Sequence, residues 1–350
     1  MLEESVIVAH LSVAMTTTEV TQITTENSLT SSLLLDVKFY VESAVMVLGL
    51  VGTAANALIL YGLVASRQHK KHVLIFNQNA LDLFASFFLI VTYAVKLCSI
   101  RLTGSLGYWL CVMVYSDVFI WWGITGSTIN LASITVERYL KVVHPVWSKK
   151  KLRSWMIYSA AGFAWIFCAV YDFALVAMTT VAIDGTCYAN VIWQNETARV
   201  IHFIWYFMSF YVIVLLIFTL GYWRILTVIR RQARVMAGYR VPGSNTGQTM
   251  QLSLVESSVV KTMILVSALF AISQLPGHIF YLLMNVNPNL AFADVAYFTT
   301  LFIAFLYICA NPFIYAIKFD PVEQAILRLI PCRRSISDQA HESIELAQLV

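Results

Sequence analysis

The chain contains 350 residues, of which 59% are hydrophobic and 12% are charged; its net charge is +4 and its mean hydropathy is +0.74. A soluble chain of this length would form about two domains under a more charged surface. The composition therefore argues against a soluble protein, and the short, separated basic segments argue against nucleic-acid binding.

Seven apolar stretches follow one another along the chain, and each is long enough to cross a bilayer. A hydrocarbon core about 30 Å thick needs about 20 apolar residues in a helix. Lipid offers the backbone no hydrogen bonds, so the stretches must be helical. The sequence predicts an all-α membrane protein, a seven-transmembrane helix bundle within residues 39–318. The stretches are 39–66, 73–97, 108–137, 154–180, 200–223, 261–285 and 294–317.

The basic residues predict how this bundle is oriented. Of the 23 Lys and Arg residues, only Lys38, Lys96, Arg101 and Arg199 lie on the side of the N-terminus, and the other 19 lie on the opposite side. Because basic loops remain in the cytosol, we expect a multi-pass protein of the plasma membrane with an extracellular N-terminus and a cytoplasmic C-terminus. Residues 1–38, rich in Thr, Ser and acids, are expected to be a disordered extracellular segment.

Two modifications are expected on the extracellular side. Asn195-Glu196-Thr197 is a glycosylation sequon between the fourth and fifth stretches. Cys111 and Cys187 both fall in the oxidising compartment, and a disulfide between them is our first choice. Cys98 lies near the same surface, so a pairing that involves Cys98 is the rival.

The segment after the seventh stretch is expected to lie on the inner membrane surface. Apolar residues recur there at helical spacing, which predicts a short amphipathic helix over 319–331 in contact with membrane lipid. Cys332, next to two Arg residues, is a candidate for lipidation, and an unmodified thiol is an equal alternative. Residues 332–350 are then a cytoplasmic tail.

Polar residues and prolines stand at particular places within the apolar stretches. Ionisable residues inside a membrane are costly and usually functional. The residues at these places are Asn56, Asp82, Cys111, Glu137, Arg138, Tyr139, Pro145, Trp165, Cys187, Tyr222, Pro276, Asn311, Pro312 and Tyr315. Taken together, in their order along the chain, they resemble the rhodopsin-like (class A) family of G-protein-coupled receptors, over about residues 39–332 and without a close subfamily.

This resemblance implies a receptor that binds an extracellular ligand and activates a heterotrimeric G protein when the sixth helix moves outward. Arrestin and a receptor kinase are further expected partners. In the family, an acid at the foot of the sixth helix pairs with the Arg that ends the third, which here implies a pair between Arg138 and Glu256 in the inactive state. The alternative is a solvated acid in a loop.

Other residues are expected to change their contacts on activation. Tyr222 and Tyr315 would meet near Arg138 in the active state, or each would anchor its helix at the interface. Pro276 interrupts the sixth stretch, with Phe270 six residues earlier.

The resemblance also implies a sodium site made by Asp82, Ser127 and Asn311, and no other cofactor. A carboxylate among hydroxyl and amide oxygens suits a hard cation. A protonated Asp82 that is hydrogen-bonded to Asn311 is an equal alternative.

The chain departs from the family at three places. Two residues before Pro276, where the family usually has Trp, this chain has Gln274. Val214 stands where the fifth helix usually has Pro. Cys111 lies 27 residues before Arg138, two more than usual, which requires a half-turn shift or a bulge in the helix.

The third departure bears on the ligand. Amine receptors of the family hold the ligand with an Asp 18 residues before the Arg, and here that residue is Ile120. Asp117, three residues earlier on roughly the same face, is expected near the mouth of the pocket. A small amine deep in the bundle is therefore disfavoured, and a peptide or larger molecule with a basic group is favoured.

The ligand-binding candidates lie in the outer parts of the helices, and Asp117 and Gln274 rank first. Asp172 is either a partner for a ligand cation or a helix-end acid wetted by the loop. The other candidates are aromatic residues and histidines, which more often pack within a bundle: Tyr93, Trp121, His202, Tyr206, His278, Tyr281 and Tyr297.

Other seven-helix functions have less support. No Lys lies between Asp294 and Asn311, so retinal cannot be attached as in an opsin. No catalytic motif is present, so we expect that the protein is not an enzyme. The alternative that remains is a seven-helix ligand-binding or scavenging receptor without G-protein signalling.

Overall fold

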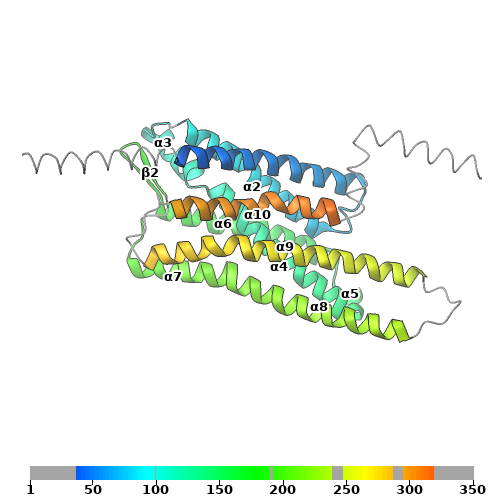
Figure 1. Ribbon diagram of the computed structural model, residues 1–350. Helices are drawn as coiled ribbons and strands as arrows, with labels where there is room; N and C mark the ends of the chain where they lie inside the picture. The colour runs from blue at the N-terminus through cyan, green and yellow to red at the C-terminus, as the bar shows by residue number, and fades with distance from the viewer. Residues whose placement is uncertain (1–36, 99, 190–191, 239–246, 287–294, 319–350) are drawn as a thin grey trace, which may run out of the picture.

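The computed structural model describes residues 37–98, 100–189, 192–238, 247–286 and 295–318, without the side chains of Ala233, 236–238, 247–259 and 317–318. The helices run side by side in one elongated bundle (Figure 1), with a small β-hairpin at one end and α5 at the other. We call these the hairpin end and the Arg138 end.

Seven spans are long and apolar enough to cross a membrane, so the predicted fold class is confirmed. The third, fifth and sixth helices are longer than their apolar stretches, because their polar ends continue as helix beyond the apolar core. The spans are formed by the first helix (Val37–Ala65), α2 (Val73–Leu97), α3–η1–α4 (Gly104–Leu110, Cys111–Tyr115, Val118–Val143), α6 (Ser154–Thr179), α7–η2–α8 (Glu196–Phe207, Met208–Val212, Ile213–Gly238), α9 (Gly247–Val286) and α10 (Val295–Lys318).

Three short elements lie outside the spans. Helix α5 (Pro145–Lys151) follows the third span and begins with Pro145, whose fixed φ suits the first turn of a helix. Strands β1 (Val181–Ile183) and β2 (Thr186–Tyr188) form an antiparallel hairpin. Its turn uses Asp184 and Gly185, both at positive φ. This hairpin is not among the elements predicted from the sequence.

The two extra residues before Arg138 are absorbed by a bulge, one of the two outcomes expected. Residues Cys111–Tyr115 form a wide π-helical turn, and Asp117 then adopts the left-handed conformation with φ 61° before α4 begins. The hydroxyl of Ser116 bridges this break, accepting from the backbone N of Val118 and donating to the carbonyl of Val112. From Val118 onward the third span is then a regular α-helix.

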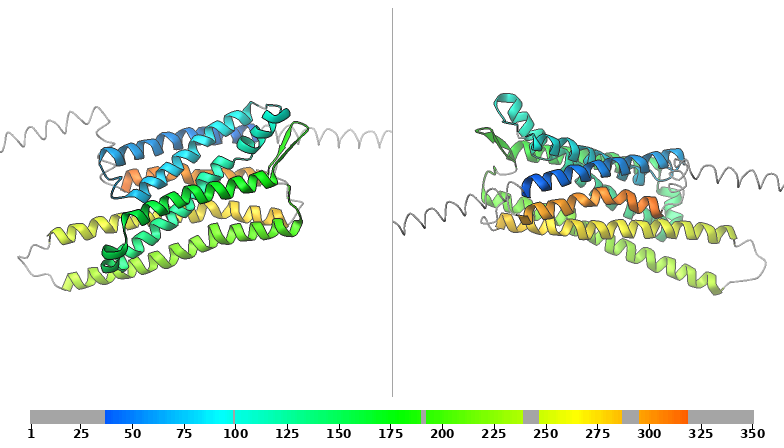
Figure 2. Two further views of the ribbon diagram at one scale, coloured as in Figure 1. Left: turned by 180° about the vertical axis from the view of Figure 1, so that it is seen from behind. Right: turned by 45° about the horizontal axis from the view of Figure 1, so that its top comes forward.

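Small residues allow the helices to approach closely. Figure 2 shows the first helix beside α10 in both views. Asn56 Nδ2 donates to the carbonyls of Gly52 and Ile308, which joins these two helices at 3.0 and 3.2 Å. A Cβ on Gly123 would lie 2.6 Å from that of Ala85, so α2 and α4 touch at this point.

Three predictions lie on residues that the structure does not describe. They are the extracellular segment up to residue 36, the amphipathic helix over 319–331, and lipidation of Cys332 in the tail. The first helix begins at Val37, so the last two residues of the expected N-terminal segment are helical.

Candidate functional site

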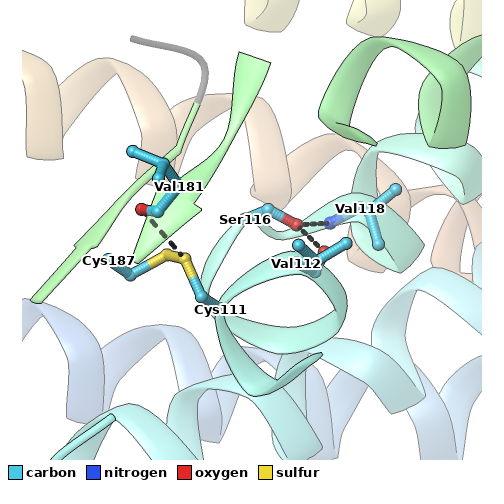
Figure 3. Close-up of a disulfide and its surroundings, with 6 residues drawn as sticks. All are labelled: Cys111, Val112, Ser116, Val118, Val181 and Cys187. Carbon is cyan, nitrogen blue, oxygen red and sulfur yellow. Dashed lines mark hydrogen bonds between the residues drawn. A yellow bond between two sulfur atoms is a disulfide. The ribbon is translucent and has the colours of Figure 1, made fainter. Parts of the chain in front are cut away.

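A disulfide between Cys111 and Cys187 ties the hairpin to the third span (Figure 3). The first of the two predicted pairings is therefore confirmed. The Sγ atom of Cys111 also lies 3.6 Å from the carbonyl oxygen of Val181 on the neighbouring strand. Cys98 is a free, exposed thiol. The bridge therefore holds β1 and β2 over the end of the bundle.

Asp117 forms an interhelical ion pair that the sequence analysis did not anticipate. Both of its carboxylate oxygens accept from Nζ of Lys96, at 2.7 and 2.8 Å. The same Nζ lies 4.7 Å from the centre of the Tyr93 ring. Lys96 lies about four turns after Asp82 on α2, so both side chains are on the inward face of this helix. This spacing could have predicted from the sequence that Lys96 points into the bundle.

A cavity of about 200 Å³ opens beside this ion pair, between the hairpin end of α4 and helices α6, α7, α9 and α10. Its walls bring together nine predicted ligand-binding residues from the third span and from α6, α7, α9 and α10, while Tyr93 lies under Lys96. Asp172 is buried rather than wetted by the loop, with 4% of its surface exposed. The predicted residues in the walls are Asp117, Trp121, Asp172, His202, Tyr206, Gln274, His278, Tyr281 and Tyr297.

Asp82 sits at the centre of a buried polar cluster in the middle of the bundle. One carboxylate oxygen accepts from Ser127 Oγ at 2.7 Å, and the other accepts from Asn311 Nδ2 at 2.8 Å. Gln78 donates to the Ser127 hydroxyl. The Oδ1 of Asn311 and the hydroxyl of Tyr307 are buried without a hydrogen-bond partner among the described residues. This oxygen-rich set, with one carboxylate, fits a monovalent hard cation.

The polar cluster continues towards the Arg138 end through amides. Asn130 Nδ2 donates to Gln78 Oε1 at 2.8 Å, and Asn130 Oδ1 accepts from Asn77 at 2.9 Å. Asn77 Oδ1 accepts in turn from the indole N–H of Trp165 at 2.9 Å. The matched residues Asp82 and Trp165 are therefore linked through three helices, and Gln78 and Asn130 are members of this network that sequence reasoning missed.

Arg138 is almost buried at the end of the bundle opposite the hairpin. Its Nη2 lies 3.7 Å from Glu137 and 3.2 Å from Nδ1 of His72, while Glu137 also binds Lys141. Tyr139 contacts the ring of His144. The side chain of Glu256 lies outside the described part of the chain, so the predicted pair between Arg138 and Glu256 stays a prediction.

Tyr222 joins three helices close to Arg138. Its hydroxyl lies 3.0 Å from Thr135 Oγ1 on α4 and 3.0 Å from Ser267 Oγ on α9. The hydroxyl of Tyr315 is buried without a partner among the described residues. The two tyrosines are therefore both interior residues rather than interfacial anchors.

The sixth helix is held against its neighbours around its proline. Pro276 and Pro312 both lie inside their helices, α9 and α10. Phe270 packs edge-on against Tyr307 with ring centres 5.5 Å apart. Gln274, in place of the family's usual Trp, donates to the carbonyl of Ala304 on α10 at 3.2 Å. Gln274 thus makes a polar link between α9 and α10.

Asn195 is the N-cap of α7. Its Oδ1 accepts from the backbone N of Ala198 at 2.6 Å, and the residue is exposed. The structure therefore leaves the sequon accessible at the hairpin end.

Comparison with known proteins agrees with this arrangement. A family model described as the seven-transmembrane receptor (rhodopsin family) matches residues 55–315. The Substance-P receptor of Cavia porcellus is 23% identical over 234 residues, 63% of this chain and 54% of the receptor, so the chain spans about half the length of that relative. The Somatostatin receptor type 5 of Bos taurus is 25% identical over 310 residues, 84% of this chain and 76% of the receptor. With its seven spans, its disulfide and a family match over well over half its length, this chain belongs to the rhodopsin family of seven-transmembrane receptors.

Proposed function

We propose that this receptor binds an extracellular ligand in the cavity at the hairpin end and activates a heterotrimeric G protein at the Arg138 end. The observation that carries the proposal is the bridge made by Tyr222 to Thr135 and Ser267. Outward movement of α9 separates Ser267 from Tyr222. The described arrangement is therefore suited to an inactive state that an outside stimulus releases.

The ligand is proposed to be a peptide or another large molecule. The relatives are named as receptors for substance P and somatostatin, which are both peptides. The cavity of about 200 Å³ is smaller than the roughly 300–1,000 Å³ that enclose a whole drug-sized ligand. It suits one side chain or one end of a larger ligand whose remainder contacts the hairpin.

The hairpin end is proposed to face the outside of the cell. Disulfides persist in oxidising compartments, and the Cys111–Cys187 bridge lies at this end. Asn195 is exposed there, and the basic residues concentrate at the other end. Enzymatic removal of N-glycans from the receptor in intact plasma membranes tests this orientation. A shift in gel mobility is expected for the native chain and not for Asn195→Gln.

The signalling role is tested by nucleotide exchange on each class of heterotrimeric G protein, with the receptor in lipid vesicles. Glu256→Ala is expected to raise basal exchange, because it removes the acid proposed to restrain Arg138. Glu256→Asp keeps the charge and is the matched control. Adding Arg138→Ala to Glu256→Ala is expected to abolish the increase while the amount of folded receptor stays the same. Unchanged basal exchange across every G-protein class would instead support a ligand-binding receptor that does not signal through G proteins.

A further inference from the structure

The cavity at the hairpin end contains two carboxylates, and their surroundings differ. Asp117 already accepts two short bonds from Lys96. A ligand cation could bind Asp117 only after displacing an internal lysine that also rests on Tyr93. Asp117 and Lys96 together add no net charge to the cavity.

Asp172 has no basic partner among the described residues. It lines the same cavity from α6, it is 4% exposed, and its hydrogen bond comes from the hydroxyl of Thr125 at 2.7 Å. That hydroxyl has one hydrogen, for which the carbonyl of Trp121 also competes at 2.9 Å. The buried carboxyl group of Asp172 is therefore poorly supplied with donors, which is costly inside a membrane protein.

Helix α9 brings a further acceptor to the same cavity. Nδ1 of His278 lies 2.9 Å from the carbonyl oxygen of Gln274, which only accepts, so Nδ1 carries the hydrogen. Nε2 of the neutral ring is then an acceptor, and it is buried without a partner among the described residues. Tyr206 stacks on this ring with centres 5.5 Å apart, which holds it in place.

We propose that the ligand inserts a cationic group rich in N–H donors, a guanidinium or an ammonium, that binds Asp172 and His278. This inference rests on the proposed ligand-binding function and names the chemical class that the cavity accepts. Such a group supplies a positive charge to Asp172 and a donor to Nε2 of His278. The aromatic rings of Trp121, Tyr206 and Tyr281 in the cavity walls favour a cation over their faces.

The test uses two small probes of the same shape on the purified full-length receptor in lipid nanodiscs. Nα-acetyl-arginine amide carries a guanidinium, and Nα-acetyl-citrulline amide replaces it by an uncharged urea. A ligand that binds only the folded state raises Tm, because it stabilises that state by RT ln(1 + [L]/Kd). The arginine probe at millimolar concentration is expected to raise Tm of the native receptor, measured by tryptophan fluorescence, and the citrulline probe is not. An equal response to both probes, or no response to either, overturns the proposal.

Variants assign the response to its residues. Asp172→Asn is expected to abolish the shift with the arginine probe, and Asp184→Asn, which removes a charge at the exposed hairpin turn, is expected to keep it. His278→Phe retains an aromatic ring without the acceptor and is expected to weaken the apparent affinity about tenfold, so the proposal can be tested even if Asp172→Asn does not fold. A response that is lost in the Lys96→Met/Asp117→Asn double variant but kept in Asp172→Asn assigns the cation to Asp117 and overturns the proposal. Because no G protein is present, this result is independent of the nucleotide-exchange assay.

Discussion

Nη2 of Arg138 lies 3.2 Å from Nδ1 of His72, the residue immediately before α2. A guanidinium only donates, so Nδ1 accepts and the ring hydrogen lies on Nε2. Burial, and secondly the charge of Arg138, lower the pKa of His72 to about 4, so the ring is neutral at physiological pH. The described interhelical partner of Arg138 is therefore an uncharged acceptor at the start of the second span.

Replacing His72 by Phe is expected to raise basal nucleotide exchange. The substitution removes the acceptor and leaves the ring, so the folded state loses a charge-assisted bond of about 1.5–3 kcal/mol that restrains Arg138. His72→Asn places an amide oxygen near the position of Nδ1 and is expected to remain close to the native rate. If the Phe and Asn variants behave alike, the hydrogen bond does not restrain Arg138.

The lowered pKa of His72 also predicts how stability depends on pH. Between its folded pKa of about 4 and its ordinary value of 6.5, the unfolded state binds more protons than the folded state. This histidine therefore makes the receptor less stable as pH falls through that window. Thermal unfolding measured from pH 6.5 to 4 should show a steeper loss of Tm in the native receptor than in His72→Asn. Identical slopes would show that His72 is not buried as described.

Sodium is expected to stabilise the receptor through Asp82. The buried Oδ1 of Asn311 and the two oxygens of Asp82 would share the cation. Replacing choline chloride by sodium chloride should raise Tm of the native receptor, because a cation that binds only the folded state stabilises it. Asp82→Asn is expected to abolish this increase. A sodium response that survives the substitution would place the ion elsewhere.

The contact between α2 and α4 predicts a substitution pair. Gly123→Ala would place its Cβ 2.6 Å from that of Ala85, so it should destabilise the receptor by about 1–3 kcal/mol through overpacking. Ala85→Gly in the same chain should recover most of that loss. Gly162→Ala on α6 is the matched control, because no atom lies within 4 Å of the added Cβ. Denaturation midpoints measured in one detergent would check all three variants. A midpoint that is the same in Gly123→Ala as in the native receptor would contradict the close approach of α2 and α4.

The disulfide is expected to contribute strongly to stability. Cys111 and Cys187 are 76 residues apart, and the chain-entropy relation for such a loop gives about 4.5 kcal/mol. Cys187→Ser should lower Tm markedly, and Cys98→Ser should not, because Cys98 is free and exposed. Equal losses in the two variants would indicate the rival pairing.

Several features could be predicted because they depend on neighbours along the chain. Each apolar stretch satisfies its own backbone hydrogen bonds, so length and hydropathy were enough to predict seven spans. Spacing also predicted that two extra residues before Arg138 would need a bulge or a half-turn shift. The choice between them required the structure, because the π-helical turn and the left-handed Asp117 are held by Ser116 and the disulfide.

The contacts between helices could not be predicted in the same way. The charge pattern predicts only that Lys96 lies on the side of the N-terminus, and the rotation of α2 against the third span brings it onto Asp117. His72 carries no motif, and its bond to Arg138 depends on how far the two helices are displaced along their axes. The sequence left open whether Asp172 is a partner for a ligand cation or an acid wetted by the loop. In the structure α6 packs against α4, and Asp172 is buried beside Thr125.

By itself, the sequence determined that this chain is a seven-helix membrane protein with polar residues at defined depths, because the period and length of a helix are local properties. The disulfide and the contacts of Asp82 with Ser127 and Asn311 were also expected from the sequence, but the other contacts between helices were decided by the tertiary structure. The rotation and axial register of each helix come from side-chain packing along its whole length, and a shift of one residue would separate Asp117 from Lys96 and Arg138 from His72.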